Sequence, residues 1–243
     1  MIVVILAGGY ATRLFPLTRN VAKPLLHIRG RPIIDYIFDK LERLTGIDKV
    51  MISTNKKFER HFEEWLARRP RGKVVIWAEE SHVEGEKLGA IRALGELIDE
   101  IDSEDYLVIA GDNFFTSDLG DLVAYYHERN SAVIVTYDVK DIDVVKSCSI
   151  AEVGSDGKLV RFVEKPKRPE STLIGTCIYL FPRNSIRRIH EYLSEGNNPD
   201  SPGNFIGWLC EKEPVYGYAL QGRWWDVGTP RSYDEAKRTW HGT

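Results

Sequence analysis

The sequence has few of the cysteine and histidine patterns that build disulfide or metal sites. Its three cysteines, Cys148, Cys177 and Cys210, are odd in number and widely spaced, and its six histidines show neither HxxxH nor HxH spacing. This pattern excludes a disulfide framework and a paired-cysteine metal site, and it argues against a zinc site built on histidine. We expect the cysteines to be small buried hydrophobic side chains.

Long hydrophobic runs and an excess of charge of one sign are also missing. The opening apolar run, Ile2 to Ala7, is far shorter than the roughly 20 residues of a membrane span, and no basic segment precedes it. Lys plus Arg total 33 and Asp plus Glu total 36, so the net charge of −3 gives no general attraction to nucleic acid or an anionic membrane. The sequence therefore predicts a cytoplasmic protein with neither partner.

Side chains that are chemically labile at high temperature are scarce. The chain has one glutamine, Gln221, and two methionines, while 28% of its residues are charged. This composition is typical of proteins from thermophiles. The 43% of hydrophobic residues is ordinary for a globular protein, and 243 residues correspond to one large domain or two small ones.

Strand-like and helix-like segments alternate over about the first 140 residues. The expected strands are 2–6, 49–54, 74–78, 106–110 and 132–137, and the expected helices are 32–44, 58–66, 88–101 and 119–126. Repeated strand–helix units predict a mainly parallel sheet with right-handed crossovers and helices on both faces, which is a three-layer α/β fold.

The remainder of the chain is richer in strands. Ser155-Asp156-Gly157 is a turn signal, so the segments 147–153 and 159–164 are expected to form a hairpin. Further strands are expected at 173–181 and 215–220, and further helices at 184–195, 205–211 and 230–239. Because no linker-like composition separates two parts, we expect one α/β domain over residues 1–243 with a β-rich second half.

A glycine turn followed by basic residues comes directly after the first expected strand. The segment Leu6–Gly9 leads to Arg13, and Lys23 follows ten residues later. In an open parallel sheet, ligands bind beyond the carboxyl ends of the strands. Adjacent glycines allow a phosphate to approach the backbone N–H groups, and the arginine fork matches phosphate oxygens. The alternative is a turn followed by solvated basic side chains.

Two carboxylates occupy comparable positions later in the chain. Asp112 follows the expected strand 106–110, and Asp226 precedes the Gly-Thr-Pro start of the last expected helix. A carboxylate at a strand end is a common ligand for the metal ion that accompanies a nucleotide phosphate. Aspartate is equally suited to capping a turn or a helix, so both interpretations stay open for each residue.

The pair Glu164-Lys165 lies at the end of the expected hairpin, where such a pair is usually solvated surface. If strand ends gather along one edge of one sheet, however, the arginine, the two lysines and the two aspartates converge there. Cationic groups together with carboxylates for a divalent metal are what phosphoryl-type transfer requires.

Four ordered motifs resemble the signatures of the sugar-1-phosphate nucleotidylyltransferases, also called nucleotide-sugar pyrophosphorylases. Leu6–Leu14 is similar to the LAGGxGTRL signature of that family, and Lys23-Pro24 follows in the family order. Gly111-Asp112-Asn113 resembles the GDN metal motif, Glu164-Lys165-Pro166 the EKP motif, and Asp226–Thr229 the D-x-G-T motif. The resemblance spans nearly the whole chain.

The resemblance implies a Rossmann-like nucleotide-diphosphosugar transferase fold, with a nucleotide-binding half over about residues 1–140 and a sugar-binding half over about 141–243. The implied reaction is Mg²⁺-dependent transfer of a nucleotidyl group from an NTP to a sugar 1-phosphate, with release of pyrophosphate. The implied catalytic residues are Arg13, Lys23, Asp112, Lys165 and Asp226. The implied nucleotide contacts are Leu6, Ala7, Gly8, Gly9, Arg13, Lys23, Glu80, Gly89 and Asp112, and the implied sugar contacts are Ser149, Glu164, Lys165 and Thr176.

The same resemblance assigns roles to these residues. Arg13 would clamp the β- and γ-phosphates, and Lys23 would neutralise the α-phosphate. Asp112 and Asp226 would bind Mg²⁺, the only cofactor implied. Glu164-Lys165 would hold the sugar hydroxyls and the sugar phosphate.

Several positions depart from the family pattern in the nucleotide-binding half. Ala11 stands at the third glycine of the first signature, and Pro24 stands where the thymidylyltransferase branch usually has glutamine. A base-reading glutamine near the end of the third strand is replaced by Glu79 or Glu80. A carboxylate accepts but does not donate a hydrogen bond, so these glutamates weaken a simple transfer of uracil or thymine recognition.

Departures at the sugar site leave the sugar open as well. The family's YG(V/I) motif reads Cys148-Ser149-Ile150, and its Asn-Ala-Gly reads Gly175-Thr176-Cys177. We favour dTTP or UTP and glucose 1-phosphate. The alternatives are a guanylyl- or cytidylyltransferase for another sugar or alcohol phosphate, and a non-catalytic nucleotide-binding regulatory relative.

The resemblance also implies an assembly and a domain content. Family members commonly form dimers or tetramers, so a homodimer or homotetramer is expected. Only about one helix follows Asp226, so no C-terminal β-helix of hexapeptide repeats is expected.

Overall fold

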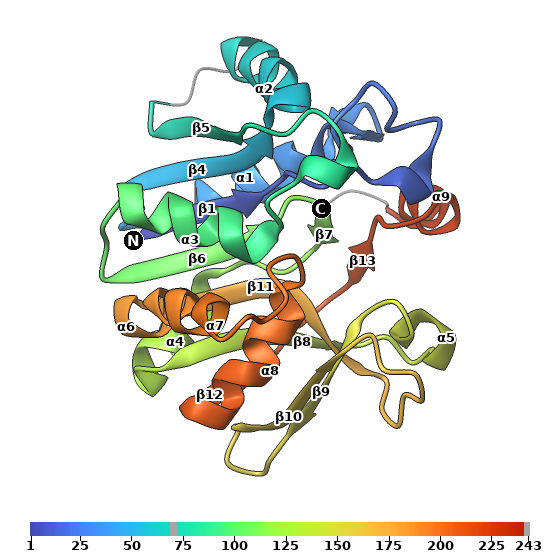
Figure 1. Cartoon of the computed structure of the whole chain (residues 1–243). Helices are drawn as coiled ribbons and strands as arrows, with labels where there is room; N and C mark the ends of the chain where they lie inside the picture. The colour runs from blue at the N-terminus through green and yellow to red at the C-terminus, as the bar shows by residue number, and fades with distance from the viewer. Residues whose placement is uncertain (69–71, 241–243) are drawn as a thin grey trace. The chain divides into compact units, whose positions relative to one another are not determined.

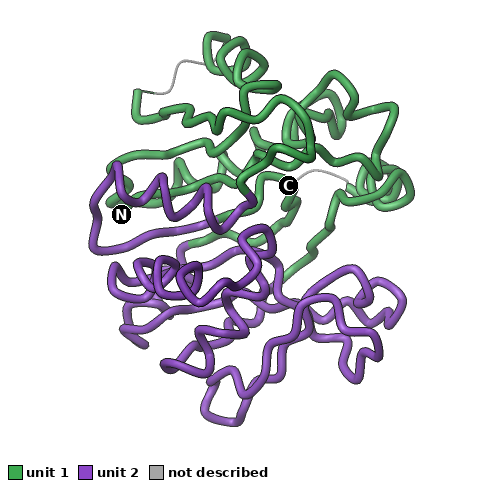
Figure 2. The backbone as a smooth tube through the Cα atoms, viewed as in Figure 1, with its two compact units in different colours: residues 1–88, 109–119, 222–243 green, residues 89–108, 120–221 purple. Residues whose placement is uncertain are grey.

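The computed structural model describes residues 1–68 and 72–240, which form two compact units (Figure 2). Unit 1 comprises Met1–Leu88, Ile109–Leu119 and Gly222–Thr243, and unit 2 comprises Gly89–Val108 and Gly120–Gln221. The chain therefore crosses between the units four times, after residues 88, 108, 119 and 221. The expected division near residue 140 does not coincide with these boundaries, because the segment after residue 221 belongs to unit 1.

Unit 1 is built on three parallel strands in the order β1 (Ile2–Leu6), β4 (Lys49–Asn55) and β5 (Val74–Glu79) (Figure 1). The helices α1 (Ile33–Leu41) and α2 (Lys56–Arg68) connect them in sequence. These strands and helices confirm the predicted alternation of strand and helix. The first helix ends at Leu41, earlier than expected.

Two short antiparallel ladders complete the strands of unit 1. Strand β7 (Asn113–Phe115) pairs with β13 (Trp224–Asp226), and β2 (His27–Ile28) pairs with β3 (Arg31–Pro32). Strands of two or three residues are too short for a periodic pattern, and the sequence did not predict them. Helix α9 (Pro230–Thr239) follows β13 and was predicted with these bounds.

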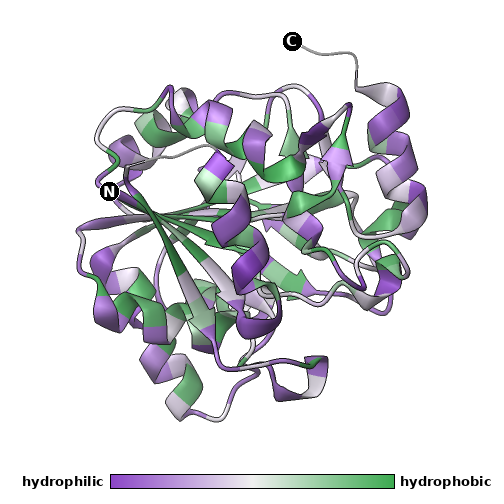
Figure 3. Cartoon of the chain, turned by 90° about the horizontal axis from the view of Figure 1, so that it is seen from above, coloured by the Kyte–Doolittle hydropathy of each residue, from purple (hydrophilic) through white to green (hydrophobic). Residues whose placement is uncertain are grey.

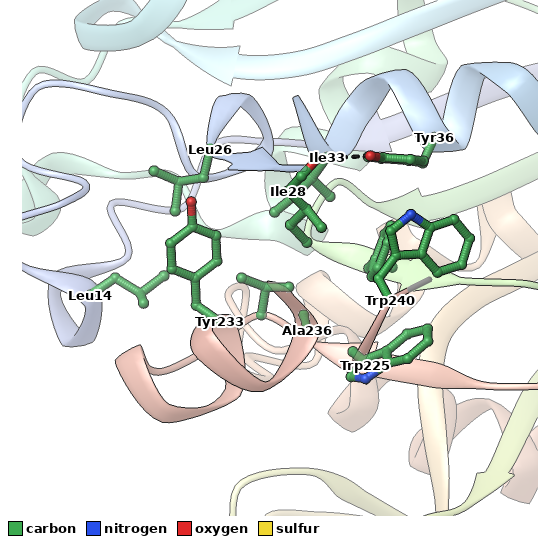
Figure 4. Close-up of a cluster of buried hydrophobic side chains, with 11 residues drawn as sticks. Leu14, Leu26, Ile28, Ile33, Tyr36, Trp225, Tyr233, Ala236 and Trp240 are labelled. Atoms are coloured by element: carbon green, nitrogen blue, oxygen red, sulfur yellow. Dashed lines mark hydrogen bonds between the residues drawn. The ribbon is translucent and has the colours of Figure 1, made fainter. Parts of the chain in front are cut away.

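A hydrophobic cluster joins the three stretches of unit 1 (Figure 4). Aromatic rings dominate it, and the Phe114 and Trp240 rings meet edge to face with centroids 4.8 Å apart. The Tyr36 hydroxyl donates to the carbonyl of Ile28 at 2.7 Å, which satisfies a buried polar group. The members of this hydrophobic cluster are Leu14, Leu26, Ile28, Ile33, Tyr36, Phe114, Trp225, Val227, Tyr233, Ala236 and Trp240.

The strands of unit 2 pair in both directions. Strand β8 (Ala132–Asp138) is antiparallel to β11 (Leu173–Pro182) and parallel to β12 (Val215–Ala219). Strands β9 (Ser149–Val153) and β10 (Leu159–Glu164) form the predicted hairpin. The mixed pairing agrees with the β-rich second half expected from the sequence.

The helices of unit 2 differ from expectation at several points. The helix expected over 184–195 is divided at Arg188 into α6 (Arg183–Arg187) and α7 (Ile189–Ser194). Helix α8 (Pro202–Lys212) begins earlier than expected, because Pro202 occupies its first turn. The N–H groups of a first turn have no partner within the helix, so proline, which has no N–H, is tolerated there. The short helix α5 (Ile142–Val145) was not predicted.

The remaining elements complete the order along the chain. Strand β6 (Asp105–Ala110) begins in unit 2 and ends in unit 1. The other elements are α3 (Ala90–Glu100), α4 (Gly120–Arg129) and the 3-10 turns η1 (Thr12–Leu14), η2 (Lys23–Leu25) and η3 (Glu84–Glu86).

Hydropathy follows the secondary structure. Figure 3 shows strands that are hydrophobic along much of their length and helices that carry both hydrophobic and hydrophilic residues. Among residues 1–68 and 72–240, none of the helices combines the length and the apolar character that a bilayer span requires.

Candidate active site

The β7–β13 ladder places the two predicted metal ligands beside each other. Asp226 pairs with Asn113, so it lies next to Asp112, the residue before Asn113. The Trp224 indole N–H donates to the side-chain oxygen of Asn113 and ties the same two strands together. Two motifs 114 residues apart in the sequence therefore meet in unit 1.

Lys23 lies against these carboxylates. Its ammonium group forms an ion pair with Asp112. Burial alone would lower the pKa of Lys23, but the charges of Asp112 and Asp226 outweigh it and raise that pKa. A Cβ at Gly111 would lie 2.8 Å from the Pro24 ring, so the absence of a side chain at Gly111 allows the Lys23-Pro24 segment to pack against the backbone beside Asp112.

Asp112 and Asp226 are both partly buried, and the pKa of Asp226 is shifted. Burial and the neighbouring Asp112 raise its pKa, while Lys23 and Arg13 oppose the rise. A Cβ at Gly228 would lie 2.6 Å from an Asp226 carboxylate oxygen, so this glycine leaves room for the carboxylate.

The helix after Asp226 is capped by a different residue. The Thr229 hydroxyl accepts from the N–H of Ser232 at 3.1 Å and completes a capping box at the start of α9. The interpretation of Asp226 as the helix cap is therefore wrong, and its carboxylate is left to the site.

Arg13 lies in η1, and its side chain is exposed. The preceding Ala11 adopts the left-handed conformation, with φ of 49°, that the family glycine would adopt without strain. The Thr18 hydroxyl donates to the Ala11 carbonyl at 2.8 Å and holds this turn. The substitution of alanine for glycine thus keeps the backbone shape of the loop.

The glycine loop is held by a residue that the sequence analysis missed. The Asn55 amide donates to the Gly8 carbonyl at 2.9 Å, and its side-chain oxygen accepts from the Phe58 N–H at 3.1 Å. Asn55 therefore connects the loop after β1 to the first turn of α2. An asparagine between a strand and a helix is a known cap signal that could have identified it.

Neighbouring backbone bonds fix the start of the loop, where it leaves β1. The Ala7 N–H donates to the Ser53 carbonyl at 2.7 Å, and the Gly111 N–H donates to the Leu6 carbonyl at 2.8 Å. A Cβ at Gly9 would meet no atom within 4 Å, so packing within the protein does not require glycine at that position.

The predicted sugar contacts lie together in unit 2. The Ser149 hydroxyl donates to Glu164, and a Cβ at Gly203 of α8 would collide with both side chains. The Lys165 ammonium lies 3.2 Å from Glu164, with Lys165 in the left-handed conformation at φ of 44°. Thr176 is 3% exposed and donates its hydroxyl to the Val135 carbonyl at 3.1 Å, so its donor is engaged within the unit.

Two further predicted nucleotide contacts are Glu80 in unit 1 and Gly89 in unit 2. The Glu80 side chain is 84% exposed, and its nearest cation is Lys56 at 3.7 Å. Gly89 begins α3 with φ of 92°, and a Cβ there would lie 2.6 Å from the Pro199 carbonyl oxygen, both in unit 2. The structure therefore accounts for this glycine by packing within unit 2.

The donor set suits a hard divalent cation. In the described part of the chain, no three His, Cys, Asp or Glu side chains form a metal-binding group. Asp112 and Asp226 supply two neighbouring carboxylates, and desolvation together with the charge of Asp112 raises the pKa of Asp226. Mg²⁺ is commonly held by one or two carboxylates, with water and substrate phosphates completing its coordination.

Comparison with known proteins places the chain in a family. The nucleotidyl transferase family matches residues 2–242. A glucose-1-phosphate adenylyltransferase of Clostridium novyi is 31% identical over 97% of this chain and 65% of its own length. A UTP–glucose-1-phosphate uridylyltransferase of Haloferax volcanii is 28% identical over 97% of this chain and 94% of its own.

A solved structure gives the same result for the fold. The crystal structure of a Bacillus anthracis protein, assigned as a glucose-1-phosphate thymidylyltransferase, matches with a TM-score of 0.86 and 25% identity. The match covers 98% of this chain and 94% of that chain. The predicted Rossmann-like α/β fold is thereby confirmed. The chain spans between 53% and 65% of the length of several curated relatives. This chain belongs to the nucleotidyl transferase family.

Proposed function

We propose that the protein transfers a nucleotidyl group from an NTP to a sugar 1-phosphate and releases pyrophosphate. The observation that carries the proposal is the convergence of Lys23, Asp112 and Asp226, with Arg13 close enough to affect the pKa of Asp226. Relatives named for this reaction support it. Glucose 1-phosphate is the proposed sugar substrate, because those names share it.

The proposed chemistry needs no strong base. An oxygen of the sugar phosphate, already an anion, attacks the α-phosphorus, and the bond from that phosphorus to the bridging oxygen of the β-phosphate breaks. The electron pair leaves with pyrophosphate. The main barrier is repulsion between anions, so positioning and neutralising charge account for most of the catalysis.

The four candidate side chains of unit 1 each have a part in this scheme. Lys23 neutralises charge at the α-phosphate, and Arg13, on the exposed turn η1, binds the phosphates that leave. Asp112 and Asp226 would hold Mg²⁺, which would neutralise charge on the phosphate oxygens when bound. In unit 2, Glu164 would accept hydrogen bonds from the sugar hydroxyls and Lys165 would hold the phosphate of the sugar.

The nucleotide is proposed to be dTTP or UTP. Relatives named for adenylyl transfer make ATP the first competitor to test. A guanylyl- or cytidylyltransferase, or an acceptor other than a sugar phosphate, is tested by the same panel.

The test is a pyrophosphate-release assay with Mg²⁺, five NTPs (dTTP, UTP, ATP, GTP and CTP) and several sugar 1-phosphates. Turnover with at least one pair is expected, with the Asp112→Asn variant as the inactive control. Folded protein that binds an NTP in calorimetry yet turns over no pair would instead identify a non-catalytic relative. Folded protein that neither binds nor reacts would refute the proposal.

A further inference from the structure

A buried chain of hydrogen bonds joins the phosphate loop to the loop after β5. The Tyr10 hydroxyl donates to Ser81 Oγ at 3.1 Å, and the Ser81 hydroxyl donates to Glu79 Oε1 at 2.6 Å. The Leu88 N–H donates to the other oxygen, Glu79 Oε2, at 3.0 Å. This relay spans the two ends of the segment between β5 and Leu88.

The relay lies in the protein interior. Tyr10, Ser81 and Glu79 are 4%, 2% and 5% exposed, so water does not replace a lost partner without cost. Tyr10 also packs against Phe58 of α2, with ring centroids 6.0 Å apart, and the Lys57 ammonium lies 5.4 Å from its ring centroid. The relay is therefore anchored on the loop that carries Gly8 and Gly9.

All the donors in the relay point toward the carboxylate. A carboxylate only accepts hydrogen bonds, and each oxygen of Glu79 already accepts one from the protein. Glu79 was one of the two glutamates expected where relatives read the base. The other, Glu80, is directed to solvent near Lys56.

We propose that Glu79 is a positioning residue for the nucleotide and does not contact the base. Through Ser81 and Tyr10 it holds the loop after β5 against the phosphate loop, so that both bind the NTP as one surface. This inference rests on the proposed nucleotidyl transfer. It predicts that disturbing the relay weakens binding of every accepted NTP by the same factor.

The first test compares Glu79→Ala and Ser81→Ala with the unmodified protein. Each is expected to raise the KM for the preferred NTP about tenfold, the equivalent of one buried hydrogen bond at about 1.4 kcal/mol. The kcat and the KM for the sugar 1-phosphate stay within about twofold, since the relay touches neither. An unchanged NTP KM in both folded variants would overturn the inference.

Glu79→Gln separates positioning from base reading. The glutamine oxygen accepts from Leu88, and its NH₂ donates to Ser81, whose hydroxyl then turns toward Tyr10. The relay survives with its direction reversed, so the ranking of NTPs by kcat/KM should be unchanged. If Glu79 contacted the base, exchanging an acceptor for a donor would change the ratio between two NTPs by about tenfold or more, and that result would overturn the inference.

The reversed relay makes a second prediction. In the Glu79→Gln protein, Tyr10 becomes the acceptor for Ser81, so adding Tyr10→Phe leaves the Ser81 hydroxyl proton without an acceptor. Tyr10→Phe should therefore raise the NTP KM more in this background than in the unmodified protein. Strictly additive effects would contradict a relay through Ser81.

Tyr126→Phe is the matched control. The Tyr126 hydroxyl also donates to a carboxylate, Asp105, but within unit 2. Tyr126→Phe should lose about as much thermal stability as Tyr10→Phe, while its KM values for NTP and for the sugar 1-phosphate stay unchanged. If it raises the NTP KM as Tyr10→Phe does, the effect is general loosening and the inference fails. Absence of turnover in the unmodified protein is a separate outcome that refutes the proposed function instead.

Discussion

At the scale of one residue, Asp226 shows the cost of placing two carboxylates side by side. Its carboxylate is partly buried beside Asp112, and both desolvation and that neighbour raise its pKa. Like charges held together in a poorly solvated place reduce the stability of the folded state. The ion pair between Lys23 and Asp112 relieves this only in part, because the pKa of Asp226 stays raised.

Replacing Asp226 by asparagine should therefore stabilise the protein while it inactivates the site. Without added Mg²⁺, we expect the free energy of unfolding to rise by about 1 kcal/mol, since a carboxylate whose charge is disfavoured in the folded state is removed. Turnover should fall by about 100-fold or more, because a ligand for the cation is lost. Denaturant unfolding and the pyrophosphate assay measure the two effects. Asp234→Asn, at an exposed position of α9, is the control and should change neither.

Gly228 makes a second prediction at this scale. Alanine there would place a methyl group 2.6 Å from an Asp226 oxygen, so the carboxylate has to move. We expect Gly228→Ala to lower turnover at least about tenfold and to raise the Mg²⁺ concentration needed for half-maximal rate. Gly120→Ala is matched, because a Cβ at that helix start meets nothing within 4 Å. Equal activity of the two variants would refute this role for Gly228.

At the scale of elements, strand ends and helix starts are joined by single polar side chains. Asn55 is the clearest case, because it ends β4, caps α2 and holds the Gly8 carbonyl at once. Strands and helices with long apolar patterns were predicted from the sequence within a few residues. The β7–β13 ladder was not, since its pairing depends on Trp224 and Asn113 meeting from distant parts of the chain.

Asn55 allows its two connections to be tested separately. Asn55→Asp keeps the oxygen that accepts from Phe58 but loses the donor to Gly8, whereas Asn55→Ala loses both. We expect the alanine variant to lose about 1–2 kcal/mol of unfolding free energy and the aspartate variant clearly less. Both should raise the KM for NTP. A wild-type NTP KM in the aspartate variant would show that the Gly8 bond does not shape the loop.

At the scale of the whole molecule, the sequence motifs predicted the family, but the sequence did not predict how the chain divides into two compact units. The four motifs predict the residues of the candidate site because each is a short, ordered pattern. Unit 1 is assembled by contacts such as those of Trp240 with Phe114 and Tyr36, which leave no local signal in the sequence. The expected halves therefore differ from the units that the fold contains.

The composition carries a prediction for the whole molecule. One glutamine, two methionines and 28% charged residues lead us to expect an unfolding midpoint above the range of about 45–65 °C typical of mesophilic domains. Calorimetry measures this midpoint directly. A midpoint near 50 °C would refute a thermophilic adaptation.

The three-part construction of unit 1 has a consequence for the time at which the site forms during synthesis. Lys23 and Asp112 are made early, but their neighbour Asp226 is translated 114 residues after Asp112. Closing so long a loop is entropically slow, and the cluster that holds β13 needs Tyr233, Ala236 and Trp240 as well. The nascent chain thus contains Lys23 and Asp112 well before Asp226, so the two proposed metal ligands come together only after synthesis has passed α9.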